Sequence, residues 1–114
     1  MTQPPHIRYA RRMERVLEYI GQHLDGDLSL EALSAVAHFS PCHFHRQFAA
    51  CTGMAVGRLV QLMRLRRASM QLVFNPGTRI IDIALQAGFG NPESFSRAFR
   101  REVGQSPGEF RQNP

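Results

Sequence analysis

Hydrophobic residues recur with helical spacing along most of the chain, whereas the alternation typical of β-strands is nearly absent. One apolar stripe runs from Arg11 to Leu24. A second runs from Leu30 to Ala37, and Ser29 stands where its side chain can cap the new helix. The pattern predicts an all-α protein.

The longest stripe is expected to form one helix from Ala55 to Phe74, because this segment holds no proline and a single internal glycine. The tripeptide Asn75-Pro76-Gly77 should end that helix, since proline disfavours helical geometry in the residue before it. Thr78 is then expected to cap a further helix that starts near Ile80.

Three further helix starts share one signal, a capping side chain placed directly before proline. The side-chain oxygen accepts an otherwise unpaired backbone N–H, and proline at the first helical position loses no hydrogen bond. Ser106 is also expected to form a capping box with Glu109. The three junctions are Ser40-Pro41, Asn91-Pro92 and Ser106-Pro107.

An internal repeat organises these helices. Residues 30–59 and 80–110 superimpose with one inserted residue near Gly90, so that the offset is 50 before the insertion and 51 after it. Each copy consists of a short helix, a tight turn and a second helix, the layout of a helix-turn-helix. The matching pairs include Leu30/Ile80, Ala37/Ala87, Phe39/Phe89, Pro41/Pro92, Phe44/Phe95, Arg46/Arg97, Phe48/Phe99 and Gly53/Gly104.

The turn of each copy needs a residue in the left-handed conformation. Gly88 supplies it in the second copy without steric cost. The first copy has His38 instead, which tolerates positive φ better than most residues. We therefore expect two helix-turn-helix lobes, about seven helices in all, with the first lobe at residues 8–53, a linking helix at 54–75 and the second lobe at 76–112.

The charge of the chain points to a partner. It holds 14 basic residues, all of them arginine, against 9 acidic ones, for a net charge of +5. This excess favours nucleic acid, although an anionic membrane would also attract it.

No apolar run reaches the length that spans a bilayer, and Cys42 and Cys51 lie too far apart on one helix for a disulfide. We therefore expect a cytoplasmic, nucleoid-associated protein with no membrane partner.

These motifs resemble those of the AraC/XylS family of bacterial transcription regulators. The likeness extends from about Arg11 to Arg111, and its strongest part is DIALQAGFGNPESFSRAFRREVGQSPGEFR, with the A-x-x-x-G-F turn and the terminal G-x-S-P-x-x-F-R. Arg64 and Ala68 in the linking segment fit as well. The resemblance implies two helix-turn-helix lobes that bind asymmetric promoter DNA, as a stand-alone activator or fused to an effector-binding domain.

The second helix of each copy is expected to enter the major groove of DNA. Its two phenylalanines, four residues apart, should face the lobe's core and leave the opposite face for base edges. Arg46 and Arg97 are the leading readers, because a guanidinium can donate two hydrogen bonds to guanine; a solvated helix face or an ion pair is the alternative for both. The full set of candidate base readers is Cys42, His45, Arg46, Glu93, Ser94 and Arg97.

Two of these candidates keep more than one interpretation. Glu93 could accept from cytosine or only favour the positive helix N-terminus. His45 could donate to a base or to a phosphate.

Phosphate contacts, which position the protein without specifying sequence, are expected from the two helix N-termini and from three arginines. These residues are Ser40, Asn91, Arg79, Arg100 and Arg101.

The length of the linking helix agrees with this arrangement. Twenty residues span about 30 Å, close to the roughly 34 Å between successive major-groove segments on one face of DNA. One chain could therefore engage two segments without dimerising.

Other chemistries are less well supported. Cys42, His43 and His45 suggest zinc but fan around a helix, so no metal or other cofactor is expected. Pro41-Cys42-His43 echoes a DNA alkyltransferase motif, but Phe44 replaces its arginine, and a redox role for Cys42 rests on a single thiol. No catalytic triad or phosphate-binding loop is present, so no enzyme is predicted. The alternative function is a helical module that docks on RNA polymerase or on a fused sensor domain.

Overall fold

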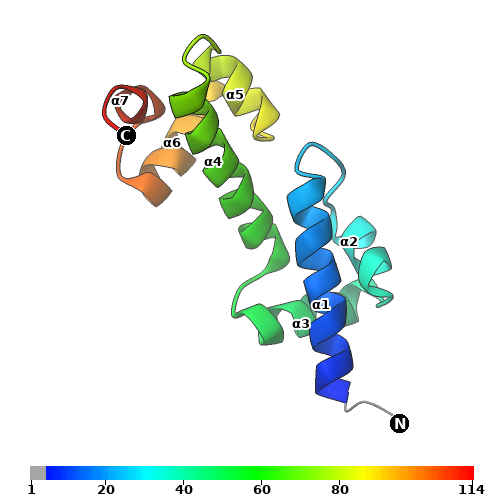
Figure 1. Cartoon of the computed structure of the whole chain (residues 1–114). Helices are drawn as coiled ribbons and strands as arrows, with labels where there is room; N and C mark the ends of the chain where they lie inside the picture. Colours follow the sequence, from blue (N-terminus) through cyan, green and yellow to red (C-terminus); the bar gives the residue numbers. More distant parts are fainter. Residues whose placement is uncertain (1–4) are drawn as a thin grey trace. The chain divides into compact units, whose positions relative to one another are not determined.

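The computed structural model describes residues 5–114 of the chain, with side chains from residue 9 onward. Every regular element in this range is an α-helix (Figure 1). The all-α prediction is confirmed. The helices are α1 (Pro5–Gln22), α2 (Leu30–Ala37), α3 (Pro41–Thr52), α4 (Val56–Phe74), α5 (Ile80–Gln86), α6 (Pro92–Val103) and α7 (Pro107–Gln112).

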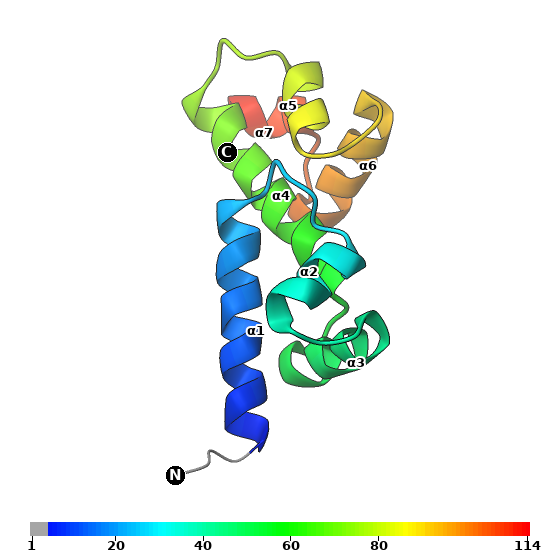
Figure 2. The ribbon, with the colours of Figure 1, turned by 90° about the vertical axis from the view of Figure 1, so that its right-hand side faces the viewer.

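The chain divides into two compact units, the first ending at Val60 and the second beginning at Gln61. The boundary falls inside α4, so each unit takes a part of that helix. Each unit contains one helix-turn-helix, α2 with α3 in the first and α5 with α6 in the second. In Figure 2 each pair is joined by a short turn.

The first unit buries an apolar face from each of its helices. In α1 the buried positions are three or four residues apart, as expected for one face of a helix. One detail of α1 was predicted wrongly: the helix ends at Gln22 rather than Leu24. The buried hydrophobic residues are Met13, Val16, Ile20, Leu33, Ala37, Phe44, Phe48, Val56 and Val60.

The second unit has a single hydrophobic cluster. Phe95 and Phe99 are fully buried at its centre, and both rings contact further aromatic rings, Phe89 on one side and Phe110 of α7 on the other. Small residues of α4, α5 and α6 allow the helix backbones to approach. The buried members are Leu65, Ala68, Leu72, Ile83, Ala84, Ala87, Phe95, Ala98 and Phe99.

Both turns are built with the same hydrogen bond. Phe39 N–H donates to the carbonyl of Ser34 at 3.0 Å, and Phe89 N–H donates to the carbonyl of Ala84 at 3.1 Å. The residue before each phenylalanine lies in the left-handed region, His38 at φ 59° and Gly88 at φ 89°. The predicted left-handed turn is therefore confirmed in both copies.

The capping predictions hold at four starts and fail in two details. Side-chain oxygens of Ser29, Ser40, Asn91 and Ser106 each accept from a backbone N–H three residues on. Helix α5 begins at Ile80, as expected, but its N-cap is Arg79 rather than Thr78, and Arg79 makes no side-chain cap bond.

The capping box at Ser106 is only half formed. Glu109 N–H donates to the Ser106 hydroxyl at 3.1 Å, as predicted. The Glu109 carboxylate, however, accepts from Arg100 of α6 rather than from the Ser106 backbone. A cation from another helix therefore replaces the local half of the box.

Candidate nucleic-acid interface

The second helix of the first unit, α3, has one buried and one exposed face. Phe44 and Phe48 are 0% exposed and their rings are 5.6 Å apart. Because residues four apart share a helix face, their burial turns Cys42 and Arg46 toward solvent on the opposite side. Arg46 has no ion pair among the described residues.

The equivalent helix α6 repeats this arrangement. Phe95 and Phe99 are also 0% exposed with rings 5.6 Å apart. Glu93 and Arg97 are exposed on the opposite face, and Arg97 donates only to the hydroxyl of Ser94, at 3.4 Å. Arg97 therefore occupies the same exposed position on α6 that Arg46 occupies on α3.

The remaining candidate base readers fall at the flanks. His45 is exposed, and Ser94 is half-buried at the start of α6. With the repeat offset of 51, Ser94 corresponds to His43, whose ring packs 4.7 Å from that of Phe39. His45 and Ser94 therefore lie at different positions of the two units and do not form an equivalent pair.

Both helix starts have an available amide. The Ser40 hydroxyl accepts from His43 N–H at 3.3 Å, and the Asn91 side chain accepts from Ser94 N–H at 2.8 Å. Proline at the first position has no N–H, so the amides of Cys42 and Glu93 are left at the positive ends of the helix dipoles. An anion could be held there.

The three arginines proposed for phosphates share a property that the proposed base readers lack. Each is paired with a carboxylate: Arg79 with Asp82 at 3.0 Å, Arg100 with Glu109 at 3.1 Å and Arg101 with Glu102 at 3.4 Å. The hydrogen bond and charge of Asp82 raise the pKa of Arg79 above its ordinary value. All three cations are exposed on the surface of the second unit.

One feature of the exposed face of α6 was not predicted from the sequence. Arg100 follows Arg97 by three residues and therefore lies on the same face of α6, one turn further along. The corresponding residue of α3 is Ala49. The offset of 51 was the signal that could have revealed this asymmetry: Glu93, Arg97 and Arg100 in one stripe against Cys42, Arg46 and Ala49 in the other.

Arg64 of α4 packs against the turn between α5 and α6, a contact that the sequence did not predict. An added Cβ on Gly88 would lie 3.2 Å from the Arg64 guanidinium, so the arginine packs directly over the left-handed turn. Gly88 therefore adopts its positive φ without steric cost and leaves space for the Arg64 side chain.

The residues considered for metal and redox chemistry are spread apart. His43 belongs to an aromatic group with Phe39 and Tyr9, over which Arg12 lies 4.8 Å from the Phe39 ring centre. Within residues 9–114, no three His, Cys, Asp or Glu side chains converge as metal ligands would. Cys42 and Cys51 are free, exposed thiols. None of the described helices has the length and apolar character needed to cross a bilayer.

Two helix-turn-helix units in one basic, all-α chain define the class of fold to which this protein belongs. A family model described as a helix-turn-helix domain matches residues 33–113. The right origin-binding protein of Escherichia coli strain K12 is 35% identical over 99 residues, which are 87% of this chain and 34% of that protein. The chain likewise spans about a third of the length of an uncharacterised helix-turn-helix regulator of Bacillus subtilis, to which it is 36% identical over 103 residues.

Solved structures agree with this classification. The DNA-binding domain of AdpA, a global transcriptional factor solved in complex with a target DNA, has a TM-score of 0.79 at 28% identity and covers 89% of this chain and 90% of its own. A probable AraC family transcriptional regulator from Rhodopseudomonas palustris has a TM-score of 0.81 at 26% identity, covering 90% and 95%. The chain belongs to the AraC-type helix-turn-helix family.

Proposed function

We propose that this chain is a sequence-specific DNA-binding module of a transcription regulator, with double-stranded promoter DNA as its partner. Helices α3 and α6 enter neighbouring segments of the major groove and read base edges. The function is binding, without a catalytic step or a cofactor.

One observation carries the proposal. Arg46 and Arg97 stand at equivalent positions of the two units, each exposed and each opposite a fully buried pair of phenylalanines. Neither arginine has a carboxylate partner among the described residues, so its guanidinium is available for two parallel hydrogen bonds to a guanine. Because neither arginine contributes to the hydrophobic core, their repetition at equivalent positions favours a role in binding.

The roles of the other side chains follow from their places on the helices. Glu93, in the first turn of α6, would accept from a cytosine amino group, and Cys42 would contact a base at the same position of α3. The amides behind Ser40 and Asn91 would hold phosphates, as would Arg79, Arg100 and Arg101 once they exchange their carboxylates for DNA. Such surface ion pairs are worth only about 0–1 kcal/mol, so the exchange costs little.

The length of α4 supports two contacts by one chain. Its 19 residues correspond to about 28 Å, comparable with the roughly 34 Å that separate major-groove segments one helical turn apart. The likeness to the AdpA domain, which was solved in complex with a target DNA, supports DNA as the partner.

Salt dependence tests binding itself. Affinity for duplex DNA should fall linearly on a log–log plot against salt, with a slope of about −0.9 for each phosphate contacted. Fluorescence anisotropy of a labelled promoter fragment between 50 and 200 mM salt, about the range over which counterion release is seen, measures this slope. A chain that leaves the duplex unbound at low salt is not a DNA-binding module.

Two neighbouring arginines of α6 then separate base readout from phosphate contact. Arg97→Ala should lose about 1–3 kcal/mol of discrimination at one base pair, whereas Arg100→Ala should weaken all sequences alike. Both substitutions remove one positive charge from the same helix, so each controls for the other. Identical effects on every sequence would contradict the assignment of Arg97.

A second function, activation through a protein partner such as RNA polymerase or a fused sensor domain, is favoured by exposed apolar residues in the second unit. Met70 and Phe74 share one face of α4, and Ile81 and Leu85 share one face of α5; Phe74 is 71% exposed. Leu85→Ala should then reduce activated transcription in a purified system without changing affinity for DNA. Unchanged activation would exclude this face of α5.

A further inference from the structure

The end of α4 leaves a main-chain carbonyl that its own helix cannot satisfy. The carbonyl of residue Leu72 would accept from the N–H four residues on, but that residue is Pro76, which has no N–H. The Leu72 side chain is fully buried, so water has poor access to this part of the helix. A donor must therefore come from elsewhere in the chain.

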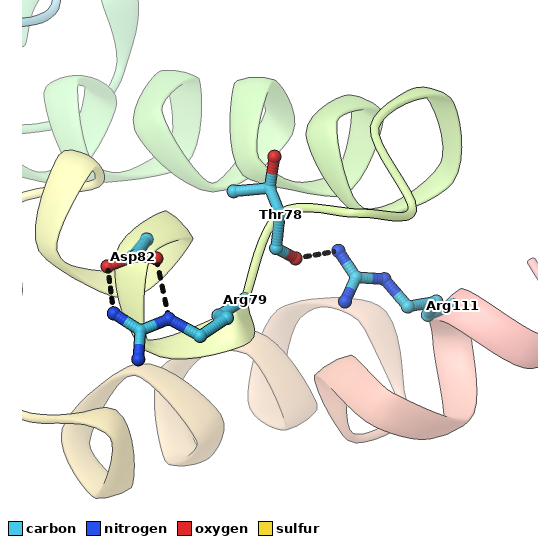
Figure 3. Close-up of polar contacts among 4 residues, drawn as sticks. All are labelled: Thr78, Arg79, Asp82 and Arg111. Carbon is cyan, nitrogen blue, oxygen red and sulfur yellow. Dashed lines mark hydrogen bonds and ion pairs between the residues drawn. The ribbon is translucent and has the colours of Figure 1, made fainter.

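Arg111 of α7 supplies that donor and two more. Its Nε donates to the Leu72 carbonyl at 3.0 Å, and its Nη2 donates to the carbonyls of Asn75 at 3.3 Å and Thr78 at 2.7 Å. Figure 3 shows the bond to Thr78. The cation thus lies at the negative end of the α4 dipole and across the turn that Thr78 N–H closes on the Asn75 carbonyl at 3.0 Å.

The helix that follows this turn has no cap of its own. The N-cap of α5, Arg79, makes no side-chain cap bond, and its guanidinium is directed to Asp82 instead (Figure 3). The bond from Arg111 to Thr78 therefore holds the backbone immediately before α5. In the first unit, Ser29 caps α2 locally, and the position equivalent to Arg111 is the buried Val60.

Helix α7 is itself fixed to α6. The Phe110 ring meets the Phe99 ring at 5.4 Å, and Pro107 is fully buried. Arg111 therefore connects the end of α4, the start of α5 and the helix that packs on α6. Since Ile83 and Ala84 of α5 belong to the same buried cluster as Phe95 and Phe99, a shift of the first turn of α5 would be transmitted to α6.

We propose that Arg111 is a positioning residue for base recognition by the second unit: it sets the start of α5 and, through α5, the angle at which α6 presents Arg97. The inference rests on the proposed function for its DNA readout, while its structural part can be measured without DNA.

The first test compares Arg111→Gln with Arg66→Gln, an exposed α4 arginine of the same unit, so that both variants lose one charge. Amide hydrogen exchange of residues 79–84 should become about tenfold faster in Arg111→Gln and remain unchanged in the control, because only local opening near α5 is released. Unchanged exchange in Arg111→Gln overturns the proposal, whether or not the wild-type chain binds DNA.

The second test asks for selectivity. Discrimination between a preferred duplex and one with a substituted base in the segment read by α6 should fall about fivefold or more in Arg111→Gln, whereas discrimination in the segment read by α3 should be retained. Equal loss in both segments would indicate general destabilisation and contradict a positioning role. Wild-type protein that binds no duplex would refute the proposed function alone.

Two further variants keep the test valid if Arg111→Gln folds poorly. Arg111→Lys keeps the cation near the helix end, but its single nitrogen cannot stand at both the Nε and the Nη2 positions, so it should melt close to wild type and still lose discrimination. Pro76→Ala restores an N–H for Leu72, so the acceleration of exchange caused by Arg111→Gln should be smaller in that background. Strictly additive effects of Pro76→Ala and Arg111→Gln would contradict the link between them.

Discussion

In the first unit the side chain of Ser29 caps the start of α2, and the turn between α2 and α3 passes through His38. In the second unit Arg111 of α7 holds the backbone before α5, and the turn between α5 and α6 passes through Gly88. The backbone hydrogen bonds are the same in both, from Phe39 to Ser34 and from Phe89 to Ala84. The repeat has therefore kept the backbone conformation while the side chains that support it have changed.

The difference extends to the exposed faces. The second unit has three arginines along α6, and two of them are paired with carboxylates, whereas α3 has Arg46 alone. The arginines proposed for phosphate contacts thus concentrate on the second unit, while the exposed arginine opposite the phenylalanine pair is common to both. We infer that the shared position serves base recognition, and that the second unit supplies more of the affinity that does not depend on sequence.

The largest expected effect concerns the buried phenylalanines, where the two units should behave alike. Phe48→Ala and Phe99→Ala should each reduce the free energy of unfolding by about 3–5 kcal/mol, because both rings are fully buried and the cavity cannot close. Thermal melting followed by circular dichroism measures this loss. If only one variant were destabilised, the two cores would not be equivalent.

The turn residues should respond in opposite directions. Gly88→Ala should destabilise the protein by about 1–3 kcal/mol, since it places a Cβ at positive φ and against Arg64. His38→Gly should stabilise it by about 1 kcal/mol, because glycine removes the strain of a left-handed histidine. Chemical denaturation of both variants gives the two signs, and a loss of stability in His38→Gly would mean that the histidine side chain contributes more than its backbone costs.

The smallest of these effects concerns the N-cap residues of α2 and α5, Ser29 and Arg79, which correspond at the offset of 50. Ser29→Ala should cost about 1 kcal/mol because it removes a cap bond to Ala32 N–H. Arg79→Ala should stay within about 0.5 kcal/mol, since it removes only an exposed ion pair. Denaturant midpoints compare the two, and an equal loss would show that α5 depends on its own N-cap after all.

The stability of the first unit is expected to depend on pH in the acid range through Asp27. Backbone and side-chain hydrogen bonds from Ser29 lower the pKa of Asp27 below its ordinary value. A carboxyl with a lowered pKa stabilises the fold above its unfolded pKa, and this contribution is lost as the pH falls through the lower, folded value. Asp27→Asn should therefore flatten the acid limb of the stability curve, and an unchanged limb would show that the carboxylate does not support the start of α2.

Local features of the fold could be predicted from the sequence because each involves neighbouring residues. A serine or asparagine before proline needs only the next three residues to cap a helix, and the three junctions formed as expected. The repeat likewise identified the buried phenylalanines and the exposed arginines, since a helix face follows from spacing alone.

What could not be predicted depends on residues far apart in the chain. Arg111 lies 39 positions from Leu72, and a separation of this length does not predict a hydrogen bond between them. Glu109 had a local partner in the predicted capping box but pairs with Arg100, nine positions away. Thr78 was expected to cap α5 from its identity, but the N-cap of that helix is Arg79, and the Thr78 carbonyl accepts from Arg111, 33 positions away.

Selection of bound sites from a randomised pool of duplexes, carried out with the wild-type chain and with Arg46→Ala and Arg97→Ala, tests the central claim most directly. The wild-type chain should select two short elements whose centres lie about ten base pairs apart, and each variant should relax one base position, in a different element. Relaxation of the same position by both variants, or unchanged preferences in either, would contradict base recognition by two equivalent helices.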